Sequence, residues 1–93
     1  METQRMLCLC TNHVSKETAG LMDSNSIEEV ILYVKGEYGW FVYIPDSIKF
    51  ELDEDKIPQD LYQCMEFACD NGFDWIMFDR DVETINELPA YEW

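Results

Sequence analysis

The sequence predicts an α+β fold: a four-stranded sheet with two helices on one face, joined in the order strand, helix, strand, strand, helix, strand. Three observations predict it. Residues 29–45 have the pattern of a β-hairpin, residues 58–71 that of an amphipathic helix, and residues 73–81 that of a buried strand that ends in acidic residues. This βαββαβ order is typical of the split, ferredoxin-like two-layer sandwich. With 93 residues, the chain makes a single domain, residues 1–93.

The first strand and helix come from the first quarter of the chain. Residues 6–10, Met-Leu-Cys-Leu-Cys, are apolar on both faces, which favours a central strand. Ser15 then has the place of an N-cap, and Glu17 lies in the first turn, where the helix dipole favours an acid. A short helix is therefore expected up to Asp23–Ser26, with Ala19, Leu21 and Met22 on its apolar side.

The hairpin has β-branched and aromatic residues in both arms, residues 30–34 and 40–44. Gly36 and Gly39 mark the turn, and Pro45 ends the second arm because it cannot donate to a sheet ladder. Residues 46–57 are expected to form a connection.

The second helix is expected from Pro58, which suits a first helical position, to Asn71, with Gly72 as the C-cap. Helical periodicity places Leu61, Cys64, Met65 and Ala68 on the packed side. The opposite side carries Gln59, Gln63, Glu66 and Asp70.

With the last strand, residues 73–81, the predicted sheet has a second, aromatic face that the helices do not cover. Such an apolar face is expected to be buried against another segment or molecule. Alternation along the strands directs one set of side chains away from the helices: Ile31, Tyr33, Phe41, Tyr43, Trp75 and Met77. Three covers are open: the acidic and aromatic tail 82–93, a second copy of the chain, or a partner. The tail is the favoured cover, because it contains Val82, Ile85, Leu88, Tyr91 and Trp93.

Charge decides which partners suit this chain. Twenty Asp and Glu against six Lys and Arg give a net charge of −14. Residues 51–93 hold thirteen of these acids and only two of the bases. Nucleic acids and anionic membranes bind through Lys and Arg, so both are disfavoured as direct partners, and a basic protein is favoured.

Enzyme signatures are weak in this sequence. His13 is interpreted as a local hydrogen-bonding residue at a strand end rather than a general base. Asp79 and Asp81 at the end of a strand could hold a divalent metal, with Asp74 or His13 completing the site. The simpler interpretation is that both are turn or cap residues and that Arg80, which lies between them, forms local ion pairs with them. No cofactor or metal site is therefore predicted.

The four cysteines, Cys8, Cys10, Cys64 and Cys69, lie on apolar segments and are expected to be buried free thiols. The N-terminus lacks a secretory pattern, so a reduced, cytoplasmic location is expected.

The acidic residues of the second half are the main candidate binding surface, because carboxylates spaced along a helix and its flanks can imitate a track of phosphates. The alternative is a solvated surface that serves only solubility. The candidate set is Glu51, Asp53, Glu54, Asp55, Asp60, Glu66, Asp70, Asp79, Asp81, Glu83 and Glu87.

Several motifs resemble a family of small uncharacterised acidic proteins carried on plasmids and integrative elements, often encoded near antirestriction genes. They are His13-Val14-Ser15 with Thr18 and Leu21, Tyr38-Gly39-Trp40-Phe41, Asp74-Trp75-Ile76 with Phe78-Asp79-Arg80-Asp81, and Leu88-Pro89 with Tyr91 and Trp93. The resemblance spans most of the chain and assigns no site residue. It implies that the protein is encoded on a mobile genetic element. Small acidic proteins of such elements include inhibitors of restriction and CRISPR systems, some of which imitate DNA.

These observations lead to one functional hypothesis and two alternatives. The first is a non-enzymatic, monomeric or homodimeric DNA mimic that occupies the basic nucleic-acid-binding surface of a host or defence protein. The second is a structural or assembly module that docks a protein, or dimerises, through the aromatic sheet face of Tyr33, Phe41, Tyr43 and Trp75. The more distant third is a metal-dependent enzyme at Asp79 and Asp81.

Overall fold

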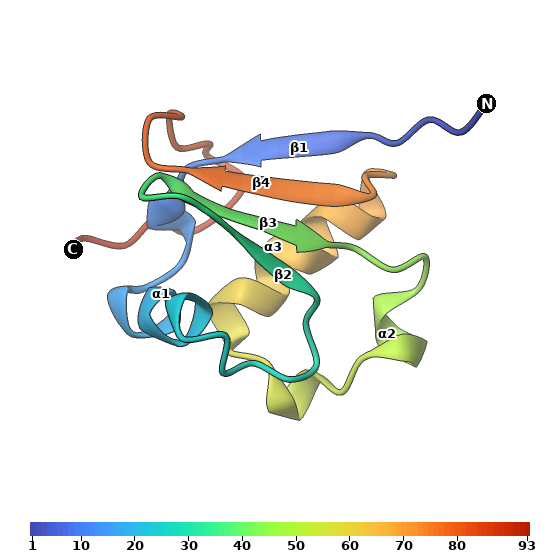
Figure 1. The fold of residues 1–93 in the computed structure, drawn as a ribbon, viewed down its shortest axis with the longest axis horizontal. Coiled ribbons are helices and arrows are strands. Elements are labelled where there is room, and N and C mark those ends of the chain that lie inside the picture. Colours follow the sequence, from blue (N-terminus) through green and yellow to red (C-terminus); the bar gives the residue numbers. More distant parts are fainter.

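The computed structural model describes all residues from Met1 to Trp93 (Figure 1). Its elements follow in order: β1 (Met6–Leu9), the 3-10 helix η1 (Thr11–His13), α1 (Lys16–Asp23), β2 (Leu32–Lys35), β3 (Gly39–Tyr43), α2 (Ile48–Glu51), the 3-10 helix η2 (Glu54–Lys56), α3 (Gln59–Asp70) and β4 (Trp75–Asp79). The α+β class and the four-stranded sheet are confirmed. The single-turn α2 and η2 were not predicted and lie within the expected connection 46–57.

The strand order, β1-β4-β3-β2, differs from the predicted ferredoxin-like arrangement. In a split βαβ unit the first and third strands form a central pair. Here β1 is an edge strand, parallel to β4, and β4 lies between β1 and β3. The apolar run of residues 6–10 therefore does not mark a central strand: Met6 and Cys8 are exposed, because only one face of this edge strand is covered.

One sheet face forms the core with the helices. Leu9, Val42, Ile76 and Phe78 are fully buried there, and they join residues of α1, α2 and α3 in one hydrophobic cluster. The packed side of α3 is as predicted, with Leu61, Cys64, Met65 and Ala68 all buried. In α1, Ala19 and Met22 are buried, whereas Leu21 remains exposed.

Local signals placed the helix ends well. The Ser15 hydroxyl accepts a hydrogen bond from the Thr18 amide at 3.2 Å, as expected of an N-cap. Gly72 follows α3 with φ +77°, a conformation that favours glycine. Gly39 has a second role beyond the turn: an added Cβ would overlap the Phe78 carbonyl, so the close approach of β3 to β4 requires glycine there.

The tail lies on the helix side of the molecule, which corrects the prediction that it packs over the aromatic sheet face. Leu88 belongs to the core cluster, and Ile85 packs against it. The Tyr91 amide donates to the Asn12 carbonyl at 2.8 Å, and the Trp93 indole donates to the Val14 carbonyl at 2.9 Å. These contacts tie the tail to η1 and to the segment between η1 and α1. No helix is long and apolar enough to cross a membrane.

Candidate functional site

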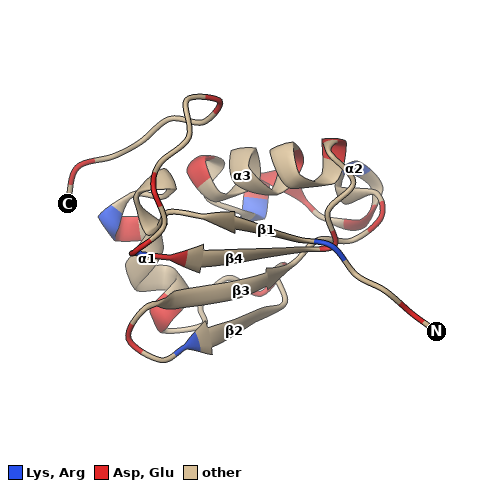
Figure 2. Cartoon of the chain, turned by 90° about the horizontal axis from the view of Figure 1, so that it is seen from above, with Lys and Arg blue, Asp and Glu red and all other residues tan.

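The predicted acidic residues are spread over three parts of the surface (Figure 2). The first is the α2–η2 segment, the second is α3 with the adjacent tail, and the third follows the end of β4. Of the eleven residues proposed, eight are exposed, Glu66 and Asp79 are partly buried, and Asp60 is buried. Asp79 forms the single ion pair of the molecule, with Lys35 at 3.0 Å. The other carboxylates are therefore not neutralised by a cation of the same chain.

Asp60 is the one candidate that the structure removes from the surface. Its side chain accepts hydrogen bonds from the Ser15 amide at 2.6 Å, the Thr18 hydroxyl at 2.8 Å and its neighbour Leu61 at 2.9 Å. The residue is only 9% exposed. Asp60 therefore connects the first turn of α3 to the first turn of α1 and is not available to a partner.

A shallow acidic groove lies between α3 and the tail. Glu66 and Asp70 from α3 and Glu87 from the tail line it, together with the apolar side chains of Phe67 and Leu88. The groove has a volume of about 250 Å³. Folding thus brings Glu87 beside two helix carboxylates, a grouping that the helix pattern alone could not predict.

Asp79 and Asp81 do not form a metal site with other residues. The Asp79 carboxylate accepts from the Asp81 amide at 2.8 Å and from Lys35 Nζ. The Asp81 N–H, followed by the Lys35 ammonium, lowers the pKa of the Asp79 carboxyl. No group of three or more His, Cys, Asp or Glu gathers at metal-binding distances anywhere in the structure. Asp74 instead accepts from the Arg5 amide at 2.9 Å.

The aromatic sheet face is assembled as predicted. The rings of Tyr33 and Tyr43 lie 6.2 Å and 5.4 Å from the ring of Trp75, measured between centroids. Phe41 and Met6 line an open hollow of about 340 Å³ with Tyr33 and Trp75, and Gln4 closes one side by accepting from the Trp75 indole at 2.7 Å. Tyr33 remains 59% exposed, because no tail residue reaches this hollow.

His13 is a structural residue that the sequence pattern underestimated. It is 1% exposed, and both ring nitrogens bond to the distant tail. Nε2 accepts from the Ile85 amide at 3.0 Å, so Nδ1 carries the proton and donates to the Pro89 carbonyl at 2.8 Å. The sequence around His13 does not predict these partners, because Ile85 and Pro89 lie more than seventy residues further along the chain. Since both ring nitrogens are used in these bonds, neither is free to act as a base.

The cysteines are free, but the prediction that all four are buried is wrong for Cys8 and Cys69. Cys10 and Cys64 are buried as predicted, Cys69 is partly buried, and Cys8 is exposed on the edge strand. Burial, with a smaller effect of Asp60, raises the pKa of the Cys64 thiol to about 12. The thiolate is the reactive species, so Cys64 is unreactive while the protein is folded.

We expect Cys8 to react orders of magnitude faster than Cys64 with a chromogenic disulfide reagent at pH 8, because Cys8 is accessible and Cys64 is a buried thiol. Peptide mapping after brief labelling measures this. A Cys8→Ser variant serves as the control and should lose the fast phase. Rapid labelling of Cys64 in that folded variant would contradict the packing of α3.

These features define a small α+β protein with an acidic surface, an open aromatic sheet face and a histidine-anchored tail. The family model described as "Family of unknown function (DUF5983) C-terminal domain" matches residues 6–93. The chain belongs to this family. No curated protein and no solved structure matches it significantly.

Proposed function

We propose that the protein is a non-enzymatic binding protein whose acidic surface occupies the basic nucleic-acid-binding surface of another protein. The observation that supports this is that the negative charge of the carboxylates is not neutralised by cations of the chain: of twenty acidic residues, only Asp79 is in an ion pair. A surface of this kind attracts basic clefts and repels nucleic acids and anionic membranes. The target would be a host or defence protein in the cytoplasm, and the protein a DNA mimic of the antirestriction or anti-CRISPR type.

The α3–tail groove is the proposed centre of this surface. It presents Glu66, Asp70 and Glu87 around the apolar side chains of Phe67 and Leu88. Interfaces combine an apolar centre with a polar rim, and charge complementarity mainly sets the association rate and the specificity. Asp60 has no part in the contact, because its carboxylate is used inside the protein.

Reversing the three groove charges should abolish binding. In the variant Glu66→Lys, Asp70→Lys, Glu87→Lys, a basic cleft would meet lysines, and like-charge contact costs several kcal/mol, or about a hundredfold or more in affinity. The matched control reverses Glu2, Glu17 and Glu28, which are exposed and lie outside the groove. It changes the net charge equally and should bind as wild type does.

The measurement starts from a protein captured on immobilised wild type from a lysate of the source cells. Duplex DNA should displace that protein, and its affinity should fall steeply as salt rises. Equal binding of wild type and both lysine variants in low and moderate salt would contradict the proposal. Thermal melting of each variant checks that the fold is intact.

A second candidate function is docking or dimerisation through the aromatic sheet face. The observation in its favour is that the tail leaves the hollow of Met6, Tyr33, Phe41 and Trp75 open. The same experiment separates the two functions. Binding that persists in high salt and in both lysine variants, but is lost in a Tyr33→Asp variant, would assign the contact to this face.

A further inference from the structure

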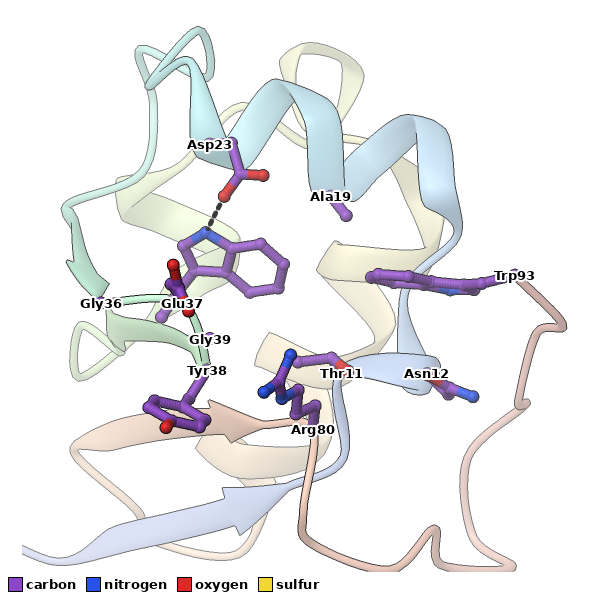
Figure 3. Close-up of a pocket in the computed structure, with 11 residues that line it drawn as sticks. Thr11, Asn12, Ala19, Asp23, Gly36, Glu37, Tyr38, Gly39, Arg80 and Trp93 are labelled. Carbon is purple, nitrogen blue, oxygen red and sulfur yellow. Dashed lines mark hydrogen bonds between the residues drawn. The ribbon is translucent and has the colours of Figure 1, made fainter.

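A third hollow, separate from the α3–tail groove and from the aromatic sheet face, opens where η1, α1, the β2–β3 turn and the tail meet (Figure 3). We call it the Trp40–Trp93 cleft. It has a volume of about 390 Å³, and its walls include Trp40, Trp93 and Arg80. A volume of this size is within the range of small-molecule sites.

Two indole rings form walls of the cleft, and hydrogen bonds fix both of them. Trp40 donates to Asp23 Oδ1 at 2.9 Å and packs edge-on against Phe78, with centroids 6.3 Å apart. Trp93 donates to the Val14 carbonyl at 2.9 Å and is still 53% exposed. The Trp93 ring is thus held in place with one surface open, as a platform for a planar ring needs.

Arg80 supplies an unused cation beside these rings. Its guanidinium lies 4.8 Å from the Tyr38 ring centroid, and its backbone amide donates to the Tyr38 carbonyl at 2.9 Å. The guanidinium has no ion pair and no hydrogen bond, although the chain carries twenty acids. The sequence interpretation that Arg80 pairs with Asp79 or Asp81 is therefore wrong, because Lys35 takes Asp79.

Further polar groups line the same cleft. The Thr11 hydroxyl and the side-chain amide of Asn12 make no hydrogen bond within the protein. The carboxylates of Asp23 and Glu37 lie on the side of α1 and the β2–β3 turn. A guanidinium is suited to a carboxylate or phosphate, and a carboxylate accepts from an N–H group. The cleft therefore offers an indole ring for stacking, a guanidinium for an anionic group, and carboxylates that can accept hydrogen bonds from N–H groups of a ligand.

We propose that this cleft binds a small planar heteroaromatic molecule that carries a carboxylate or a phosphate. Its ring stacks on Trp93 beside Trp40, its anionic group meets Arg80, and its ring N–H or amino group faces Asp23 or Glu37. This site is independent of the acidic groove and of the aromatic sheet face.

The test uses the full chain and two anionic probes, indole-3-acetate for the carboxylate and adenosine monophosphate for the phosphate. Calorimetry should detect one probe per chain, and the neutral counterparts 3-methylindole and adenosine should bind about tenfold more weakly, since they lack the charge-assisted bond. Whichever anionic probe binds identifies the anion. If neither binds wild type at millimolar concentration, the proposal is overturned.

Variants locate the site. Arg80→Gln should reduce the affinity for the anionic probe to that of its neutral counterpart, and Trp93→Leu should weaken both. The matched control is Arg5→Gln, since Arg5 also stacks on a ring, that of Phe73 at 4.5 Å, but its guanidinium already donates to the Asn71 carbonyl. Binding unchanged in Arg80→Gln would overturn the assignment.

An NMR titration of wild type gives a readout that does not depend on variants folding. The probe should shift the indole N–H resonances of Trp40 and Trp93 and leave that of Trp75, on the opposite sheet face, unchanged. A shift confined to Trp75 would place the ligand in the aromatic hollow and would overturn the proposal.

Discussion

Replacing Asp60 with alanine should lower the free energy of unfolding by about 2–6 kcal/mol. The change leaves two donors at the start of α1, the amide of the N-cap Ser15 and the Thr18 hydroxyl, without their partner. Each buried donor left unsatisfied costs about 1–3 kcal/mol. Urea unfolding followed by circular dichroism measures the effect.

Asp70→Ala is the matched control for this prediction, because it removes an exposed acid from the same helix. Its effect should stay within about 0.5 kcal/mol, as for most surface substitutions. Asp60→Asn should fall between the two, since its amide oxygen still accepts hydrogen bonds. If Asp60→Ala were as stable as Asp70→Ala, the carboxylate would not hold the two helices together.

Replacing His13 with alanine should destabilise the protein by about 3 kcal/mol or more and release the tail. The Ile85 amide and the Pro89 carbonyl lose their partners, and each costs about 1–3 kcal/mol if it stays buried. A cavity in the core adds to this loss. The tail should then become sensitive to protease around residues 84–92, and Trp93 emission should shift to longer wavelength.

The control is the neighbouring Asn12→Ala, whose side chain makes no hydrogen bond inside the protein; it should change stability by about 0.5 kcal/mol at most. The His13 variant should also lose any ligand of the Trp40–Trp93 cleft, because the tail positions Trp93. A His13→Ala protein with a protected tail and unchanged melting temperature would show that the histidine bonds are dispensable.

Local sequence patterns predicted the main helices and strands, but not the short helices η1, α2 and η2. The Ser15 cap, the packed side of α3, the hairpin and the buried β4 strand follow from periodicity, capping and turn residues within a few positions of each other. Alternation also assigned the aromatic sheet face correctly, because in a strand it depends only on the pleat. Composition alone gave the negative surface.

Only the tertiary structure decided the remaining features. The strand order depends on which strand β4 pairs with, and that pairing joins residues about seventy positions apart, as in Met6 with Trp75. The helix pattern made Asp60 an exposed acid, but docking α3 against α1 buries it beneath Ser15 and Thr18. The prediction for the tail was wrong, because its apolar residues suit either face of the sheet. Burial of Leu88 in the core and the hydrogen bonds with the distant His13 help to hold the tail on the helix side. Residue type specifies what a side chain can bond to, whereas the packing of distant segments specifies which partner it meets.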